Sequence, residues 1–115
     1  IGIEDPTDTD RCFCGVGVTN HAVCTSGDYL RYAVIDGKPY GHILDPRTGR
    51  PALTPCRSVT TIASTCTEAG ILSTAAFILG IQDGRSFLES SSQAEGCLWS
   101  EGNVHETRGF RKYVL

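Results

Sequence analysis

The sequence predicts an α+β fold in which two helices pack on one face of a mainly antiparallel sheet. Three observations support this prediction. Turn signals at Asp36-Gly37 and Gly102-Asn103 separate short alternating segments that are typical of strands. A capping-box pattern opens a long apolar stretch, and the expected order of elements is strands, two helices, strands. With 115 residues the chain has room for one modest core, so we predict a single domain over residues 1–115.

The N-terminal part of the chain is expected to contribute two short strands. Residues 1–11 are polar and acidic and are predicted to form a leading loop. Residues 13–18 alternate as a strand does, and a turn over residues 19–21 leads into a second strand over residues 22–25.

The stretch over residues 26–50 is predicted to fold back on itself as a β-hairpin. Asp36-Gly37 is a strong short-range hairpin signal. Along the second strand the two-residue period places four side chains on a common face: Lys38, Tyr40, His42 and Leu44. His42 is therefore expected to stand beside an aromatic ring, with Ile43 on the opposite face.

The clearest helix is predicted over Cys66–Leu79, after a β-branched strand at Ser58–Ala63. Thr65 and Glu68 fit the capping box, in which a hydroxyl and a carboxylate reciprocally satisfy two backbone donors. An apolar stripe follows them, and Gly80 stands where a C-terminal cap is expected.

A second helix and a closing hairpin are expected to complete the fold. The helix is predicted over residues 84–91. Its cap and its two inward-facing side chains are expected to be Asp83, Phe87 and Leu88. The hairpin joins residues 97–100 to residues 104–107 through Gly102-Asn103.

Charge and composition exclude some classes of partner. The net charge is -3, without the basic patch of a nucleic-acid-binding protein, so no nucleic-acid partner is expected. No apolar run approaches the length of a membrane span, and no signal peptide or lipid-attachment cysteine is visible at the start. The chain contains no methionine and opens on Ile1, so we expect that a segment upstream has been removed.

Six cysteines are many for a chain of this length, and they leave two alternatives open. They lie at positions 12, 14, 24, 56, 66 and 97. An even count permits a disulfide framework in an exported protein, although the pairing cannot be chosen from sequence. Alternatively, several are small buried hydrophobic residues in a reduced protein. A structural zinc site is disfavoured because paired C-x-x-C spacings are absent.

Two neighbouring stretches carry residues that suggest chemistry. His42 is followed closely by a polar turn over residues 45–49, whose arginine and threonine are able to hold an anion, so this pattern suggests phosphate-ester chemistry. The stretch over residues 26–29 admits two interpretations. In the first, Ser26 and Asp28 face a ligand on which a tyrosine packs. In the second, the stretch is a bend in which Asp28 bonds its own backbone.

Motifs spread along the chain resemble those of one known family. They are Ser26-Gly27-Asp28-Tyr29 with Arg31, the run from His42 to Gly49, Ser58-Val59-Thr60, and Leu72-Ser73-Thr74-Ala75 with Leu79-Gly80. The match continues outward to Ile1-Gly2-Ile3 with Asp5-Pro6, so it covers nearly the whole chain. On these residues the chain resembles the C-terminal part of the ApbE family, the FAD:protein FMN transferases. Family members have a further N-terminal region that holds much of the flavin-binding surface, and nothing in this sequence resembles it.

The resemblance implies an activity and a set of site residues. An ApbE enzyme splits FAD, transfers the FMN half to a threonine hydroxyl of a target protein and releases AMP, with magnesium required. His42 is by motif the expected catalytic base, a task suited to an imidazole. The expected FAD-binding residues are Ser26, Gly27, Asp28, Tyr29, Arg31, Asp45, Arg47 and Thr48. Arg47 either neutralises the pyrophosphate or simply caps its turn.

The resemblance also implies partners and a location. The expected partners are FAD, a flavin-acceptor protein with a target threonine, and the N-terminal region, on this chain or on another. The family's location implies a periplasmic or exported protein that is anchored to the membrane, as a lipoprotein, through that N-terminal region.

The expected metal site departs from the family pattern. ApbE proteins place an aspartate and a threonine four residues apart on this helix, a spacing that puts both side chains on one face. Here Thr74 is the expected metal ligand, but Gly70 occupies the position of the aspartate. Loss of that carboxylate is expected to weaken magnesium binding. Glycine also costs the helix about 1 kcal/mol relative to alanine.

Three functions therefore stay open. The first is the C-terminal portion of a flavin transferase, with His42 as base and Thr74 as the remaining metal ligand. The second is a catalytically silent flavin-binding or interaction module, suggested by Gly70 and by the missing N-terminal region. The third is an exported domain held together by disulfides, without a ligand.

Overall fold

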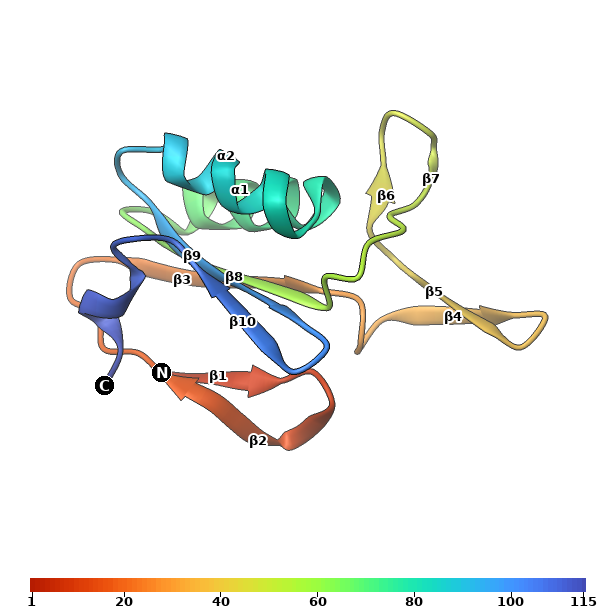
Figure 1. The fold of residues 1–115 in the computed structure, drawn as a ribbon, viewed down its shortest axis with the longest axis horizontal. Helices are drawn as coiled ribbons and strands as arrows, with labels where there is room; N and C mark the ends of the chain where they lie inside the picture. Colours follow the sequence, from red (N-terminus) through yellow and green to blue (C-terminus); the bar gives the residue numbers. More distant parts are fainter.

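The structure is a computed structural model that describes residues 1–115. Its centre is a four-stranded antiparallel sheet in the order β10-β9-β8-β3, and both helices pack on one face of this sheet (Figure 1). The elements of these two layers are β3 (Ala22–Gly27), β8 (Ser58–Ala63), α1 (Cys66–Leu79), α2 (Ile81–Ser90), β9 (Glu95–Ser100) and β10 (Asn103–Glu106). The predicted α+β class is confirmed.

The other elements are three small hairpins and a short 3-10 helix. They are β1 (Gly2–Asp5) with β2 (Asp8–Gly15), β4 (Tyr32–Ile35) with β5 (Lys38–Gly41), β6 (Leu44–Asp45) with β7 (Arg50–Pro51), and η1 (Phe110–Tyr113). The β1–β2 hairpin and η1 lie on the side of the sheet opposite the helices, whereas the other two hairpins project beyond the sheet (Figure 1).

The core lies on both faces of β8. All of its residues are buried, and the strand lies between β3 and β9 in the sheet. Alternate side chains therefore pack on opposite faces. Val59 joins the cluster that contains Phe77 under the helices, while Ile62 packs with Ile3 and Phe110 on the other side. The β-branched run at this position forms the predicted strand.

Residues 1–11 form β1 and part of β2, so the predicted leading loop is wrong. Most of these residues are polar because most of the hairpin is exposed, yet Ile3 is buried against the sheet. Asp5 builds the connecting turn, since its carboxylate accepts hydrogen bonds from the hydroxyl and the amide of Thr7. These hydrogen bonds lower the pKa of Asp5.

The first helix begins and ends where the sequence predicts. Thr65 caps it, and the Thr65 hydroxyl accepts a hydrogen bond from the amide of Glu68. The Glu68 carboxylate accepts from the hydroxyl of Ser64, so only one half of the predicted capping box forms. At the other end Gly80 takes a φ of 85° and its amide donates to the last turn of α1.

The second helix begins at Ile81, three residues earlier than predicted. Gly80 ends α1 and also caps α2, because its positive φ lets the chain change direction at a single residue. Asp83 therefore lies in the first turn of α2 and is not its cap. Phe87 and Leu88 pack against the core as expected. No helix in the structure is both long enough and apolar enough to cross a membrane.

The β4–β5 hairpin has the turn that Asp36-Gly37 predicts. Both central residues have positive φ, 52° and 76°, as a type I′ turn requires. The second strand is shorter than predicted, because β5 ends at Gly41 and His42 begins a bend. At Gly41 the backbone passes so close to Asp28 that an added Cβ would lie 2.7 Å from the Cβ of Asp28. The alternation that grouped Tyr40 with His42 therefore stops before His42.

The closing hairpin joins β9 to β10 through a two-residue turn. Its central residues are Glu101 and Gly102, with φ of 49° and 81°. The turn lies one residue earlier than predicted, and Asn103 instead begins β10, opposite Ser100.

Candidate functional site

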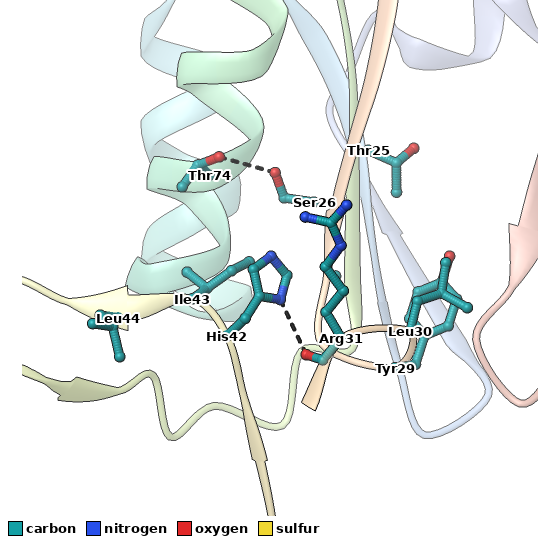
Figure 2. A pocket seen from close by; sticks show the side chains of 10 residues that line it. Thr25, Ser26, Tyr29, Leu30, Arg31, His42, Ile43, Leu44 and Thr74 are labelled. Carbon is teal, nitrogen blue, oxygen red and sulfur yellow. Dashed lines mark hydrogen bonds between the residues drawn. The ribbon is translucent and has the colours of Figure 1, made fainter. Parts of the chain in front are cut away.

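A pocket of about 570 Å³ opens between the end of β3, the middle of α1 and the segment that follows β5 (Figure 2). Six of the residues predicted at the site line it: Ser26, Gly27, Tyr29, Arg31, His42 and Thr74. The structure therefore brings residues from three separate stretches of the chain to one place.

A chain of hydroxyl groups forms one wall of this pocket. The Ser26 Oγ lies 2.8 Å from the Ser73 Oγ and 3.0 Å from the Thr74 Oγ1. Ser73 also donates to the carbonyl of Gly70, at 3.1 Å. Because a carbonyl only accepts and each hydroxyl has one proton, Ser26 must donate to Ser73, and Thr74 must donate to Ser26. The oxygen of Thr74 therefore keeps its lone pairs for a ligand.

His42 faces this wall from the opposite side. Its backbone amide donates to the carbonyl of Arg31 at 3.2 Å, and its ring Nδ1 lies 3.1 Å from the same oxygen. Since the carbonyl only accepts, this contact places the proton on Nδ1, and Nε2 is the unprotonated nitrogen of the neutral ring. Figure 2 shows Nε2 turned toward the side of the pocket where Ser26 and Thr74 lie. The site thus presents an open proton acceptor.

Arg31 supplies positive charge to the pocket. Its side chain lines the cavity and extends toward Ser26 (Figure 2). The four ion pairs of the structure all involve other residues. Because no carboxylate neutralises it, the Arg31 guanidinium is free to bind an anionic ligand.

Tyr29 lines the pocket of His42, whereas Asp28 does not. The Asp28 carboxylate accepts from the Nε of Arg57 at 2.7 Å and lines a neighbouring pocket, not that of His42. Tyr29 lies between these two pockets. Burial, reinforced by the Glu4 carboxylate, raises the pKa of Tyr29 to about 12. Tyr29 therefore stays protonated at neutral pH.

The polar turn over residues 45–49 lies outside the pocket. The Nε and Nη2 of Arg47 donate to the two carboxylate oxygens of Asp45 at 3.0 and 2.9 Å. These hydrogen bonds lower the pKa of Asp45 and raise that of Arg47. Thr48 accepts from the amide of Arg50. Asp45, Arg47 and Thr48 thus stabilise their own turn, and the structure does not bring them to His42.

A second, larger pocket of about 820 Å³ adjoins the first one, under the β4–β5 hairpin. The two pockets share Leu30, Arg31 and His42. Tyr40 lines this second pocket together with His42, although β5 ends between them. His42 therefore borders two cavities.

The residues around Thr74 do not form a complete site for a divalent cation. The structure contains no group of three or more His, Cys, Asp or Glu side chains that could hold a metal ion. The oxygen in contact with the Thr74 hydroxyl is the hydroxyl of Ser26 and not a carboxylate. Gly70 lies one turn before Thr74, and a Cβ added at Gly70 would meet nothing within 4 Å. A carboxylate would fit at this position, but the sequence does not supply one.

Ser73 belongs to the site, although no motif in the sequence marks it as a site residue. Its side chain is buried on α1, where it links Ser26 to the carbonyl of Gly70. The sequence signal that could have identified Ser73 is its place on the buried, mainly apolar face of the helix. A buried hydroxyl needs a hydrogen-bond partner, so a serine at such a position indicates a polar contact. Arg57, the partner of Asp28, has no comparable signal because it lies 29 residues away in the chain.

Comparison with known proteins identifies relatives along nearly the whole chain. The ApbE family profile matches residues 1–98. An FAD:protein FMN transferase from Salmonella typhimurium is 34% identical over 108 residues, which are 93% of this chain and 31% of the relative. One from Treponema pallidum is 42% identical over 89 residues, 76% of this chain and 25% of the relative. The chain therefore spans only about a third of the length of such relatives.

Solved structures share the fold. The ApbE protein of Thermotoga maritima is similar with a TM-score of 0.87 and 38% identity, over 98% of this chain and 37% of that one. Flavin transferase ApbE from Vibrio cholerae gives a TM-score of 0.76 and 29% identity, with the same coverage of 98% and 37%. The profile match and these relatives together show that the chain belongs to the ApbE family.

Proposed function

We propose that this chain carries the catalytic base of an FAD:protein FMN transferase, which moves FMN from FAD to a threonine of an acceptor protein. The observation that carries this proposal is the pocket in which Nε2 of His42 is turned toward the hydroxyls of Ser26 and Thr74. The activity of the relatives supports it. Because the chain spans about a third of those relatives, the proposal concerns the chain acting together with the additional sequence that they contain.

In the proposed reaction His42 activates the acceptor. Its Nε2 removes the proton from the threonine hydroxyl while the hydroxyl oxygen attacks the phosphorus of the FMN half. The bond between this phosphorus and the bridging oxygen breaks, and AMP leaves with the electron pair. The imidazolium that results keeps its Nδ1 contact with the carbonyl of Arg31. That contact holds the ring in place throughout the step.

Arg31 is proposed to bind the pyrophosphate, since Arg47 is already engaged with Asp45. We expect Arg31→Ala to weaken FAD binding about 10- to 100-fold, the usual range for one charge-assisted hydrogen bond. Arg47→Ala is the matched control and should change the affinity less than about twofold, because its guanidinium does not line the pocket. Calorimetric titration with FAD, with the N-terminal region present, measures both. Equal losses for the two variants would refute the assignment to Arg31.

Magnesium is proposed to bind only weakly here without FAD, because Gly70 supplies no carboxylate to accompany Thr74. A bound cation would shield the charge of the pyrophosphate. We expect Gly70→Asp to raise magnesium affinity at least about tenfold once the N-terminal region is present, since an added side chain meets open space. Gly70→Ala adds the same Cβ without the carboxylate and should leave the affinity unchanged.

Titration calorimetry with magnesium, with and without FAD, compares the three forms at position 70. Equal metal affinity for the glycine, alanine and aspartate forms would show that the ligands come from elsewhere. The same titration without FAD establishes whether Thr74 and water hold the cation unaided.

The β4–β5 hairpin is proposed to dock the additional N-terminal sequence found in the longer relatives. Its apolar side chains are unusually exposed: Tyr32, Val34 and Ile35 have 55%, 63% and 57% of their surface accessible, and nearby Leu53 has 78%. Tyr32, Ile35 and Leu53 line the same pocket, and clustered exposed apolar side chains mark an interaction site in soluble proteins. The additional sequence of the longer relatives would cover it and complete the flavin pocket.

A mass-spectrometric assay tests the function as a whole. The chain is incubated with FAD, magnesium and a threonine-bearing acceptor protein, with and without the N-terminal region supplied as a separate chain. The proposal expects an FMN adduct on the acceptor and release of AMP when both parts are present. FAD binding without an adduct would instead support the silent flavin-binding module, which Gly70 favours.

A further inference from the structure

Two cysteines that the proposed transfer does not use lie in contact beside the site. The Sγ of Cys24 on β3 is 3.6 Å from the Sγ of Cys66, the first residue of α1, and 3.5 Å from the carbonyl oxygen of Cys66. All six cysteines are free in the structure. Only this pair brings two sulfurs within contact distance, and Cys66 is exposed.

We propose that Cys24 and Cys66 form a reversible disulfide that ties β3 to the start of α1. A disulfide needs its sulfurs about 2.05 Å apart. The sulfurs already lie 3.6 Å apart, so a small adjustment of the two side chains closes the bond. Cys24 is half-buried and Cys66 exposed at the helix end, and neither side chain has to leave the tightly packed core.

A low-molecular-weight disulfide such as oxidised glutathione is the oxidant for this bond. Cys66 attacks first because it is exposed: its thiolate bonds to one sulfur of the small disulfide and expels the other as a thiolate. Cys24 then attacks the sulfur of Cys66 and expels the second small thiolate. Two electrons pass to the small disulfide, and the two thiol protons pass to the thiolates that it releases. Burial raises the pKa of Cys24, which makes it the slower nucleophile and the resolving residue.

The bond would act on the same strand and helix that form the hydroxyl wall. Cys24 and Ser26 are two residues apart on β3, so their side chains lie on one face. Cys24 contacts the first residue of α1, while Ser26 contacts Ser73 and Thr74 further along the helix. Since β3 is the last strand of the sheet, the disulfide adds a second, covalent attachment for an edge strand. It depends only on this geometry and holds whether or not FMN transfer occurs.

Peptide mapping of the intact protein tests the proposal. The protein is equilibrated in glutathione buffers of increasing oxidised fraction, free thiols are blocked with N-ethylmaleimide, and the digest is analysed without reduction. We expect a cross-linked pair of tryptic peptides covering residues 12–31 and 58–85, which disappears on reduction. Because Cys12, Cys14 and Cys24 share the first peptide, the variant Cys24→Ser assigns the bond. It must abolish the cross-link, whereas Cys14→Ser must retain it.

The thermal transition supplies an independent readout. Closing a loop of about 40 residues should raise the Tm of the oxidised protein by about 10 °C over the reduced protein. The shift must vanish in Cys66→Ser, an exposed position where substitution spares the core. Separate glutathione adducts on Cys24 and Cys66, labelling of both by N-ethylmaleimide in oxidising buffer, or a cross-link retained in Cys24→Ser would each overturn the proposal.

Discussion

The substitution His42→Gln is expected to lower the rate of FMN transfer by about 10²- to 10⁴-fold, the usual contribution of a positioned general base. Glutamine retains a side chain of similar reach, but it has no nitrogen that accepts a proton at neutral pH. The loss should fall on kcat, because the proposed role of His42 is to take a proton from the acceptor and not to bind the pyrophosphate. Quantitative mass spectrometry of the acceptor at saturating FAD measures the rate.

His21→Gln is the matched control for this experiment. The Nδ1 of His21 also contacts a backbone carbonyl, that of Thr19 at 2.7 Å, and its side chain is exposed, but it lines neither of the pockets that border His42. The control should retain the full rate. If His42→Gln retains it as well while FAD still binds, another group removes the proton and the proposed mechanism is wrong.

The substitution Gly84→Ala is expected to lower the free energy of unfolding by about 2–3 kcal/mol, the cost typical of forcing extra volume into a packed interface. A Cβ at Gly84 would press on the carbonyl oxygen of Ala76 and lie 3.1 Å from its carbonyl carbon and 3.2 Å from the Cδ2 of Leu98. The first two atoms are backbone, so α2 has to move away from α1. Urea denaturation monitored by circular dichroism measures the loss, with an unchanged m-value as evidence that both states keep their compactness.

Gly70→Ala, on the neighbouring helix α1, is expected to change the free energy of unfolding in the opposite direction. No atom lies within 4 Å of a Cβ added at Gly70, and alanine favours the helix over glycine by about 1 kcal/mol. We therefore expect this variant to be more stable than the parent by about 0.5–1 kcal/mol. If Gly84→Ala also raised the free energy of unfolding or left it unchanged, the close packing of α2 on α1 would not explain the glycine at position 84.

The predictable parts of the fold depend on signals that lie close together in sequence. The cap at Thr65, the stop at Gly80 and the turn at Asp36-Gly37 each involve residues within one turn of chain, and each appears where expected. The β1–β2 hairpin escaped prediction because its register shifts on either side of Glu4. These irregularities break the alternation that reveals a strand, and Ile3 is the only fully buried residue of the two strands.

The candidate site shows the same contrast between residues marked by local motifs and contacts between distant residues. Local motifs selected Ser26, His42 and Thr74, and the structure brings all three to one pocket. What the sequence could not predict depends on contacts between distant residues. The close approach of Gly41 to Asp28 joins residues 13 positions apart, and the pairing of Asp28 with Arg57 spans 29 residues. Of the two roles left open for Arg47, the structure shows the contact within the turn, because the neighbouring Asp45 binds its guanidinium.

The projecting β4–β5 hairpin makes the two sides of the pocket unequal in local stability. Its residues are mostly exposed and its strands pair only with each other, so it opens at a small free-energy cost without disturbing the sheet. The opposite wall, with Ser26 and Thr74, is attached to β8, which is buried along its whole length and opens only when the molecule unfolds. His42 therefore sits at the boundary between a cooperative unit that stays closed and one that fluctuates. A segment that covered the hairpin would therefore also fix the position of His42 opposite the hydroxyls of Ser26 and Thr74.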